Sequence, residues 1–262
     1  MAYTFISGAT GGIGKAFCKE IAKSGAEIFI TGRSGEKLEI LKRELISLGA
    51  RAVEYFPCDL TSETSRKEML AFTDERGLKF ERIINVAGVD TQKGFLKYTE
   101  EKLLFQLRVN AEATTTLTHA LLLRRAEGKT SVITIASMSG VKPMPYFAVY
   151  SATKAMLINL FTALHYELKS ENVNVTVVMP GGVPTRPDII EDIKGQGLWG
   201  KLSSKPASYI AEKALIASKK NKVKCIPGFF NKFMYFLESV APRGMAERFI
   251  LRRWKKQEKD AF

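Results

Sequence analysis

The stretch Gly8-Ala9-Thr10-Gly11-Gly12-Ile13-Gly14 separates a short apolar segment, Tyr3–Ser7, from a helical pattern over Ile13–Ser24. Glycines permit a tight turn and a close approach of the backbone to a ligand, and the free N–H groups at the start of the following helix attract a diphosphate. Such turns also occur without a ligand. The position of this one, between the first strand and the first helix, predicts nucleotide binding.

Short β-rich apolar segments alternate with longer helical patterns along most of the chain. We expect strands at Tyr3–Ser7, Glu27–Thr31, Ala52–Pro57, Arg82–Val86, Ser131–Ile135, Asn174–Val178 and Lys222–Ile226. We expect helices at Ile13–Ser24, Gly35–Leu48, Ser62–Arg76, Glu100–Arg125, Tyr150–Ser170 and Ala207–Lys219. This alternation predicts βαβ units with right-handed crossovers. The predicted fold is α/β: a single-domain, Rossmann-type, doubly wound parallel sheet with helices on both faces.

Two segments depart from this alternation. Residues 186–206 contain three glycines and two prolines with weak periodicity, which is typical of a mobile loop or of short helices. Residues 227–262 follow the last predicted strand and combine aromatic residues with a basic end. Because the 262 residues show no repeat or linker, we expect one Rossmann-type domain over residues 1–226 and a C-terminal extension over residues 227–262.

The composition is that of an ordinary globular protein, with 45% hydrophobic and 26% charged residues. The longest apolar stretches, such as Val173–Pro180, are shorter than the roughly 18 residues of a spanning helix, and we expect no secretory signal. Three scattered cysteines without a CxxC pair argue against a disulfide framework and fit a reducing, cytoplasmic environment. Since His119 and His165 lack metal-ligand spacing, no metal is expected.

The chain is strongly basic, with 40 Lys+Arg against 27 Asp+Glu and a formal net charge of +13. These positive residues are spread along the chain, and no helix-turn-helix, zinc-finger or RNA-binding signature accompanies them. We therefore expect no nucleic-acid partner. A positive field of this kind favours encounter with an anionic cofactor, an acidic thioester or a membrane surface.

The end of the second predicted strand indicates which dinucleotide binds. NAD-preferring folds usually place a carboxylate here for the ribose 2′-hydroxyl, whereas NADP-preferring folds place an arginine nearby. Residues 31–35 contain Arg33 and no Asp or Glu. A guanidinium pairs with a 2′-phosphate that a carboxylate would repel, so the sequence favours NADP(H) over NAD(H). The alternative is a solvated loop arginine.

Tyr150 and Lys154 lie four positions apart within a predicted helix, and so on one helix face. A free tyrosine has a pKa of about 10, and a neighbouring cation lowers it toward the range in which proton exchange with an alcohol or carbonyl is feasible. Ser137, at the end of a predicted strand, has a hydroxyl that can polarise a carbonyl oxygen. Each feature alone also fits an ordinary helix surface or a turn serine.

Together these residues resemble the short-chain dehydrogenase/reductase family over residues 3–226, in particular its hydroxysteroid dehydrogenase and 3-ketoacyl reductase types. Ser137 stands 13 positions before Tyr150, which is the family's usual spacing. Asn110 resembles the asparagine that completes the family's catalytic tetrad. Further similar motifs are Gly8-xxx-Gly12-x-Gly14, Cys58-Asp59-Leu60, Asn85-Val86-Ala87-Gly88 (with Val86 in place of a second asparagine) and Pro180-Gly181-Gly182-Val183-Pro184-Thr185.

The resemblance implies a role for each of these residues. Tyr150 would exchange the proton, Ser137 would hydrogen-bond the developing alkoxide, Lys154 would hold the nicotinamide ribose, and Asn110 would position a water. Catalytic candidates are thus Asn110, Ser137, Tyr150 and Lys154. Cofactor-binding candidates are Gly8, Thr10, Gly12, Ile13, Gly14, Arg33, Asp59, Leu60, Asn85, Ala87, Gly88, Tyr150, Lys154, Pro180, Gly181, Val183 and Thr185.

The function implied is reversible hydride transfer between NADP(H) and a carbonyl compound or secondary alcohol. Apolar residues of the 186–206 loop, among them Ile189, Leu198 and Trp199, favour a lipophilic steroid or fatty-acyl ketone, or they merely attach a lid to the core. The alternative function is a non-catalytic NADP(H)-binding sensor or scaffold. The intact Ser137, Tyr150 and Lys154 argue against that alternative.

Family analogy implies a homodimer or homotetramer, formed through the helices predicted at 100–125 and 150–170. The tail over residues 229–262 carries a net charge of +4 and aromatics at near-helical spacing. A basic, aromatic helix is compatible with a peripheral contact to an anionic membrane, with an oligomer contact or with a substrate lid. The sequence leaves these three roles and the exact substrate open.

Overall fold

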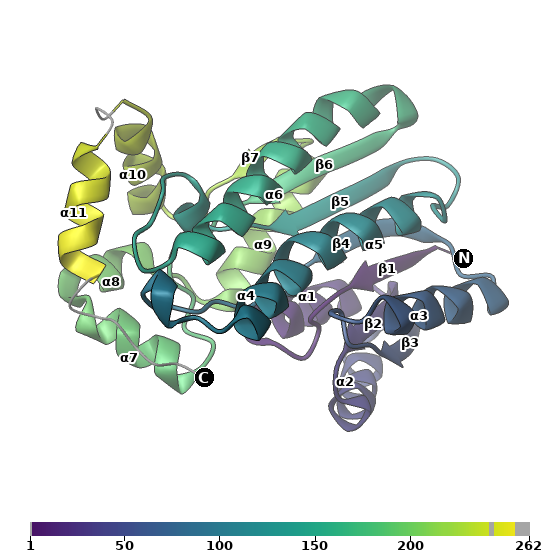
Figure 1. Ribbon diagram of the computed structural model, residues 1–262. Coiled ribbons are helices and arrows are strands. Elements are labelled where there is room, and N and C mark those ends of the chain that lie inside the picture. Colours follow the sequence, from purple (N-terminus) through teal and green to yellow (C-terminus); the bar gives the residue numbers. More distant parts are fainter. Residues whose placement is uncertain (1, 241–243, 255–262) are drawn as a thin grey trace.

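Seven parallel strands form the centre of the molecule in the order β3-β2-β1-β4-β5-β6-β7 (Figure 1). They are β1 (Tyr3–Ile6), β2 (Glu27–Gly32), β3 (Ala52–Pro57), β4 (Phe80–Asn85), β5 (Thr130–Ile135), β6 (Val173–Val178) and β7 (Lys224–Cys225). The computed structural model describes residues 2–240 and 244–254. The predicted doubly wound α/β sheet is confirmed. Its strand order reverses between β1 and β4, the point where such sheets bind ligands.

Helices cover both faces of this sheet, as predicted. One core lies between the sheet and α1 (Gly12–Ala22), α2 (Gly35–Ser47) and α9 (Ala207–Lys219). The other lies between the sheet and α3 (Glu63–Glu75), α5 (Ala113–Leu122) and α6 (Ala148–Glu167). Alternation within strands serves both cores: in β1, Phe5 belongs to the α6 side and Ile6 to the α1 side.

The start of α1 differs from the starts of its neighbours. Side-chain oxygens of Ser34 and Ser62 accept backbone N–H groups in the first turns of α2 and α3. Gly11 at the N-cap of α1 provides no such side chain. The first N–H groups of α1 therefore stay available for an external acceptor.

The predicted helix over Glu100–Arg125 is interrupted. The structure has α4 (Glu100–Leu107), a π-helical turn over Arg108–Glu112 and then α5. Predicted boundaries also shift elsewhere: β4 begins at Phe80, and β7 is only two residues long. These differences are local, because they do not change the order in which the strands pair in the sheet.

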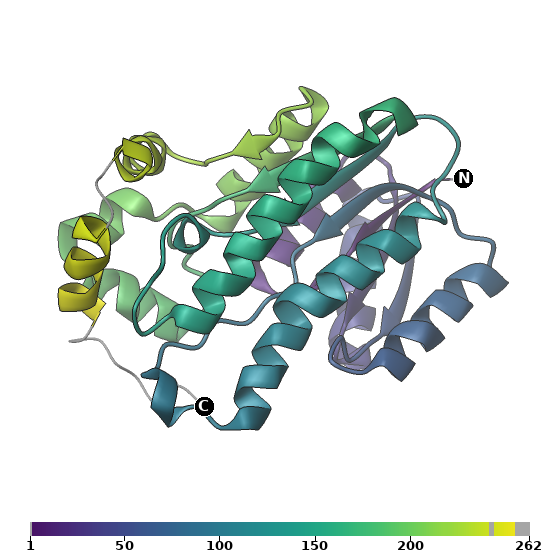
Figure 2. The same ribbon diagram turned by 45° about the horizontal axis from the view of Figure 1, so that its top comes forward.

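The 186–206 segment and the C-terminal extension form one helical layer at the carboxyl ends of the strands (Figures 1 and 2). It consists of α7 (Pro187–Gly195), α8 (Gly197–Ser203), α10 (Phe229–Val240) and α11 (Met245–Trp254). The rings of Trp199 and Phe230 join α8 to α10, with centroids 5.0 Å apart. The predicted boundary at residue 226 stays a prediction, and residues 255–262 of the predicted extension lie outside the described residues.

Candidate active site

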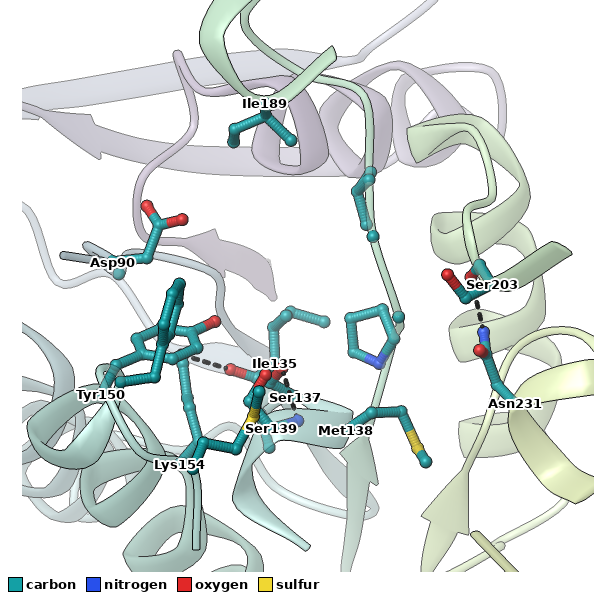
Figure 3. Close-up of a pocket in the computed structure, with 18 of the residues that line it drawn as sticks. Asp90, Ile135, Ser137, Met138, Ser139, Tyr150, Lys154, Ile189, Ser203 and Asn231 are labelled. Carbon is teal, nitrogen blue, oxygen red and sulfur yellow. Dashed lines mark hydrogen bonds between the residues drawn. The ribbon is translucent and has the colours of Figure 1, made fainter. Parts of the chain in front are cut away.

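A cavity of about 360 Å³ opens at the carboxyl ends of the strands. The segments after β4, β5 and β6 supply its polar wall, and α7, α8, α10 and α11 supply much of the rest. Figure 3 shows Asp90, Tyr150 and Lys154 on one side of this cavity and Ser203 and Asn231 on the other. The topology thus brings together residues from six separate segments of the chain.

The glycine turn after β1 is held against the segments after β4 and β6. Gly8 has a φ of +62°, and a Cβ there would lie 2.8 Å from the Cα of Ala87. A Cβ on Gly12 would overlap the side chain of Thr185, and one on Gly14 would overlap the carbonyl of Gly8. Because only glycine fits these three positions, the turn can bring its backbone close to a ligand at the strand-order switch.

Tyr150 and Lys154 project from the first turns of α6 toward Ser137 (Figure 3). The Lys154 Nζ lies 5.7 Å from the centre of the Tyr150 ring and donates to the carbonyl of Ile135 at 3.0 Å. The Ser137 Oγ accepts the backbone N–H of Ser139 at 3.1 Å, which fixes its direction. The serine, the phenol and the ammonium are therefore arranged as one cluster, the arrangement that the family resemblance implied.

Burial dominates the ionisation of this cluster. The expected lowering of the Tyr150 pKa by the neighbouring cation is wrong: burial raises the pKa of the phenol, the nearby Asp90 charge raises it further, and a hydrogen bond from Ser137 opposes both. Burial lowers the pKa of Lys154 to about 8, against an opposing effect of Asp90. The phenol is therefore neutral at neutral pH, and it lies beside an ammonium whose pKa is lowered.

Asn110 lies in the π-helical turn between α4 and α5 and is fully buried. Its Oδ1 accepts the backbone N–H of Val89, and its Nδ2 donates to the carbonyl of the same residue, each at 2.8 Å. Its Nδ2 also lies 3.2 Å from the Thr153 hydroxyl of α6. Asn110 therefore ties the segment after β4 to α6, one residue away from Lys154.

Asp90 is a site residue that the sequence reading missed. It lines the cavity and pairs with Arg186 at 3.2 Å, and this ion pair joins the segment after β4 to the start of α7. Asp90 stands two positions after the recognised motif that ends at Gly88, and Arg186 directly follows the one that ends at Thr185. Their positions just after those motifs could have indicated that they lie at the site.

Arg33 is exposed at the end of β2, beside the first turn of α2. The preceding Gly32 lies near the Thr10 hydroxyl of the glycine turn, since a Cβ on Gly32 would be 3.3 Å from the Thr10 Oγ1. Arg33 is therefore next to the glycine turn, as a residue that contacts one end of a dinucleotide must be.

Asp59 and Leu60 follow β3, further along the same edge. The Asp59 Oδ1 accepts the backbone N–H and the hydroxyl of Thr61, at 2.9 and 2.8 Å. Leu60 is buried in the core on the α6 side. Ile13 of α1 lines the cavity itself.

The side chain of Asn85 lies away from the cavity. Its Nδ2 donates to the hydroxyls of Thr118 in α5 and Thr134 in β5, at 2.8 and 3.1 Å. This places its amide between the sheet and α5, where it ties β4 to both neighbours, whereas the following Val86 and Gly88 line the cavity. The sequence motif alone does not show that the Asn85 side chain points into the protein while Val86 and Gly88 line the cavity.

The segment after β6 forms the wall between the glycine turn and the helical layer. Pro180, Gly181, Val183 and Thr185 all line the cavity. The carbonyl of Pro180 accepts the N–H of Met138 at 3.0 Å, which ties this segment to the one that carries Ser137. A Cβ on Gly181 would lie 2.5 Å from the carbonyl of Ser203, so α8 presses directly on the segment.

Comparison with known proteins defines the family. The model of the short chain dehydrogenase family matches residues 2–190. An 11-beta-hydroxysteroid dehydrogenase-like protein of Arabidopsis thaliana is 32% identical over 183 residues, which are 69% of this chain and 58% of that relative. A solved structure described as a 7beta-hydroxysteroid dehydrogenase superposes with a TM-score of 0.85 at 24% identity and covers 97% of this chain and 96% of that one. The chain belongs to the short-chain dehydrogenase family of oxidoreductases.

Two features of these matches bear on function. The chain spans less than two thirds of the Arabidopsis relative's own length, namely 58%. A human relative, 29% identical over 239 residues that are 90% of this chain and 70% of the relative, is named inactive hydroxysteroid dehydrogenase-like protein 1. The family therefore includes a relative whose name denies it activity, and the activity of this chain has to be argued from its own site.

The residues present fit the family's nicotinamide cofactor. The glycine turn provides a cradle that a Cβ would fill, and the uncapped start of α1 provides N–H groups for a diphosphate. Tyr150 and Lys154 lie at the other end of this cradle, in the cavity. The glycine turn thus adjoins the cavity that Tyr150 and Lys154 line, since Ile13, which follows the turn's Gly12, also lines that cavity.

Proposed function

We propose that this protein is an NADP(H)-dependent oxidoreductase that transfers hydride reversibly between nicotinamide and a carbonyl compound or secondary alcohol. The observation that supports this function best is the cluster of Ser137, Tyr150 and Lys154 in the wall of one cavity, beside the glycine turn. A structural role alone would not require a buried ammonium and a partly buried phenol to face a cavity.

In this mechanism the bound cofactor supplies or accepts the hydride. In reduction, Tyr150 donates its proton to the carbonyl oxygen, and its raised pKa keeps the phenol protonated until it is needed. Ser137 hydrogen-bonds the developing alkoxide, and the Lys154 ammonium stabilises the phenolate that remains. Oxidation of an alcohol runs through the same groups in reverse.

Asn110 and Lys154 are proposed to serve proton return and cofactor positioning. Gly88 leaves room between them: a Cβ there would lie 3.2 Å from the Lys154 Nζ and 3.4 Å from the Asn110 Oδ1. That gap is consistent with a water held by Asn110 between Lys154 and solvent. Lys154 would also hold the nicotinamide ribose hydroxyls, while Val183 and Thr185 orient the carboxamide.

The preference for NADP(H) is proposed from Arg33. Its exposure beside the start of α2 lets the guanidinium meet a 2′-phosphate, and Lys37 adds a second exposed cation in the first turns of that helix. Asp59 and Leu60 are proposed to contact the adenine end. The backbones at Ala87 and Gly88 are proposed to contact the nearby ribose, with Asn85 supporting them from the sheet.

The substrate is proposed to be lipophilic. The part of the cavity beyond Tyr150 is lined mainly by apolar side chains: Met144, Phe147, Ile189, Trp199, Phe230, Met234 and Ile250. Such a wall favours a steroid-like or fatty-acyl carbonyl compound over a sugar. The names of the hydroxysteroid dehydrogenase relatives agree with this class of substrate.

Assembly and location are proposed from the helical surfaces. Homodimers or homotetramers would form through α4 to α6, by family analogy. Along α10, exposed apolar side chains follow one stripe: Phe229, Phe233, Phe236, Leu237 and Val240. With the basic residues of the extension, this stripe supports a peripheral contact with an anionic membrane. In the described parts of the chain, every helix is too short or too polar to cross a membrane.

A screen of NADPH oxidation against ketones and acyl thioesters tests the proposal. We expect turnover of apolar carbonyl compounds, with NADPH preferred over NADH. The second candidate function, a non-catalytic NADP(H) sensor, is kept because a human relative is named inactive. Tight NADPH binding without turnover of any compound in the panel would favour that candidate.

A further inference from the structure

Glu238 is a carboxylate in the cavity wall that the proposed reaction does not use. It lies near the end of α10, about two turns beyond Asn231, and lines the same cavity as Tyr150. Asn231, on that same helix, faces Tyr150 across the cavity (Figure 3). Glu238 therefore belongs to the wall that the helical layer contributes to the cavity.

One oxygen of this carboxylate lacks a partner. Among the described residues, the Glu238 Oε2 is buried and makes no hydrogen bond. Burial raises the pKa of Glu238 to about 7, while the positive charge of Lys142 opposes the shift. A buried carboxylate oxygen without a donor is unfavourable in the free protein, and such a group calls for a specific explanation.

Lys142 supplies the second polar group of this part of the cavity. It lies on the segment between Ser137 and Tyr150 and also lines the cavity. The other described side chains that α10 and α11 contribute to the cavity are Phe230, Asn231, Met234 and Ile250, and the Asn231 amide already donates to the carbonyls of Ser203 and Pro227. Among the described residues, this part of the wall thus combines a carboxylate and an ammonium with apolar side chains.

This pair selects the chemistry of its ligand. A charged ligand group would be attracted by one member of this pair and repelled by the other, so it would gain little net electrostatic energy. A neutral hydroxyl satisfies both, because it donates one hydrogen bond and accepts another. We propose that Glu238 and Lys142 form a subsite for a hydroxyl group at the end of the substrate remote from its carbonyl. This inference rests on the proposed function and narrows its substrate class to hydroxylated, otherwise apolar carbonyl compounds.

Methyl ketones of increasing chain length, each with and without a hydroxyl on the terminal carbon, test the subsite. For each pair, the ratio of kcat/KM with the hydroxyl to kcat/KM without it is measured with NADPH. We expect the wild-type ratio to reach roughly tenfold at the matching length, and Glu238→Leu to abolish it. Glu238→Gln keeps an acceptor oxygen and should keep part of the ratio. Glu191→Leu is the matched control, because it makes the same change at an exposed position of α7, and it should leave the wild-type ratio unchanged.

Equal wild-type ratios near one at every length, or a preference that survives in Glu238→Leu, would overturn the subsite. Calorimetric binding of the same ketones to the NADP-loaded protein separates this result from failure of the proposed function. Hydroxyl-dependent affinity that disappears in Glu238→Leu, without any turnover, would support the subsite and count against the oxidoreductase. Turnover with an unchanged ratio would count against the subsite alone. Thermal unfolding of each variant confirms that it is folded.

Discussion

Lys154 sets the pH range in which the proposed proton transfer works. Its ammonium stabilises the Tyr150 phenolate, and burial lowers the pKa of Lys154 to about 8. Below this pH the ammonium is present, and above it the charge is lost. We therefore expect kcat/KM for carbonyl reduction to fall as pH rises through about 8, measured as a pH–rate profile of the wild-type enzyme.

Asp90 provides a check on that profile. Its negative charge raises the pKa of both Tyr150 and Lys154. Asp90→Asn should therefore move the alkaline fall in kcat/KM to lower pH. Asp188→Asn, which removes a second carboxylate bound to Arg186 but does not act on Tyr150 or Lys154, is the matched control. An unmoved profile in Asp90→Asn would show that these groups do not control the rate.

Arg33 is expected to determine the choice of cofactor. Arg33→Ala removes a charge-assisted contact to the 2′-phosphate, so the Kd for NADPH should rise about 10- to 100-fold, with little change for NADH. Fluorescence titration of both cofactors measures this. Arg51→Ala, an exposed arginine at the opposite end of the sheet, should alter neither affinity. Equal weakening of NADH and NADPH would contradict the assignment.

A variant of Asn85 tests whether this residue stabilises the packing of β4 against its neighbouring elements or contacts the cofactor directly. Asn85→Ala removes two buried hydrogen bonds that link β4 to α5 and β5. We expect a loss of about 1–3 kcal/mol in the free energy of unfolding. Urea denaturation measures this loss, and the affinity of the folded variant for NADPH should stay near wild type. A large loss of affinity at unchanged stability would reverse the interpretation.

The helices and strands show which parts of the fold could be predicted from sequence patterns. Apolar periodicity predicted all seven strands of the described sheet and both helical faces, because burial between layers requires those patterns. It did not predict the π-helical turn at Arg108–Glu112, since one such turn leaves the apolar pattern on either side intact. That turn carries Asn110. The family resemblance identified this residue, but its position and hydrogen bonds could be described only from the structure.

The helical layer was predicted only in part: Ile189 and Trp199 line the cavity, as the apolar residues of the 186–206 segment suggested, whereas Glu238 was missed. Ser137, Tyr150 and Lys154 have a recognisable spacing, and the structure brings them together as expected. Glu238 has no motif. Its significance depends on α10 folding over the cavity, a long-range contact that no local pattern encodes.

For the whole molecule, the exposed stripe of α10 predicts an association with anionic membranes. Phe229 is 85% exposed and Phe233 48% exposed. We expect co-sedimentation with phosphatidylserine vesicles that weakens with salt and with Phe229→Ser plus Phe233→Ser. Leu123→Ser, an exposed leucine at the far end of α5, should have no effect. Loss of a dimer in the double variant, with no vesicle binding by the wild type, would assign the stripe to self-association.

The proposed reaction as a whole depends on one proton donor at the end of the cofactor cradle. The most direct measurement is a single-turnover reaction of the NADPH-loaded protein with an apolar ketone, followed by nicotinamide absorbance, in wild type and Tyr150→Phe. We expect rapid NADPH oxidation by the wild type, and a rate about 100- to 10,000-fold lower in Tyr150→Phe with NADPH affinity preserved. Equal rates in the two proteins would contradict the role of Tyr150. A wild type that binds NADPH and oxidises none of it would contradict the oxidoreductase itself.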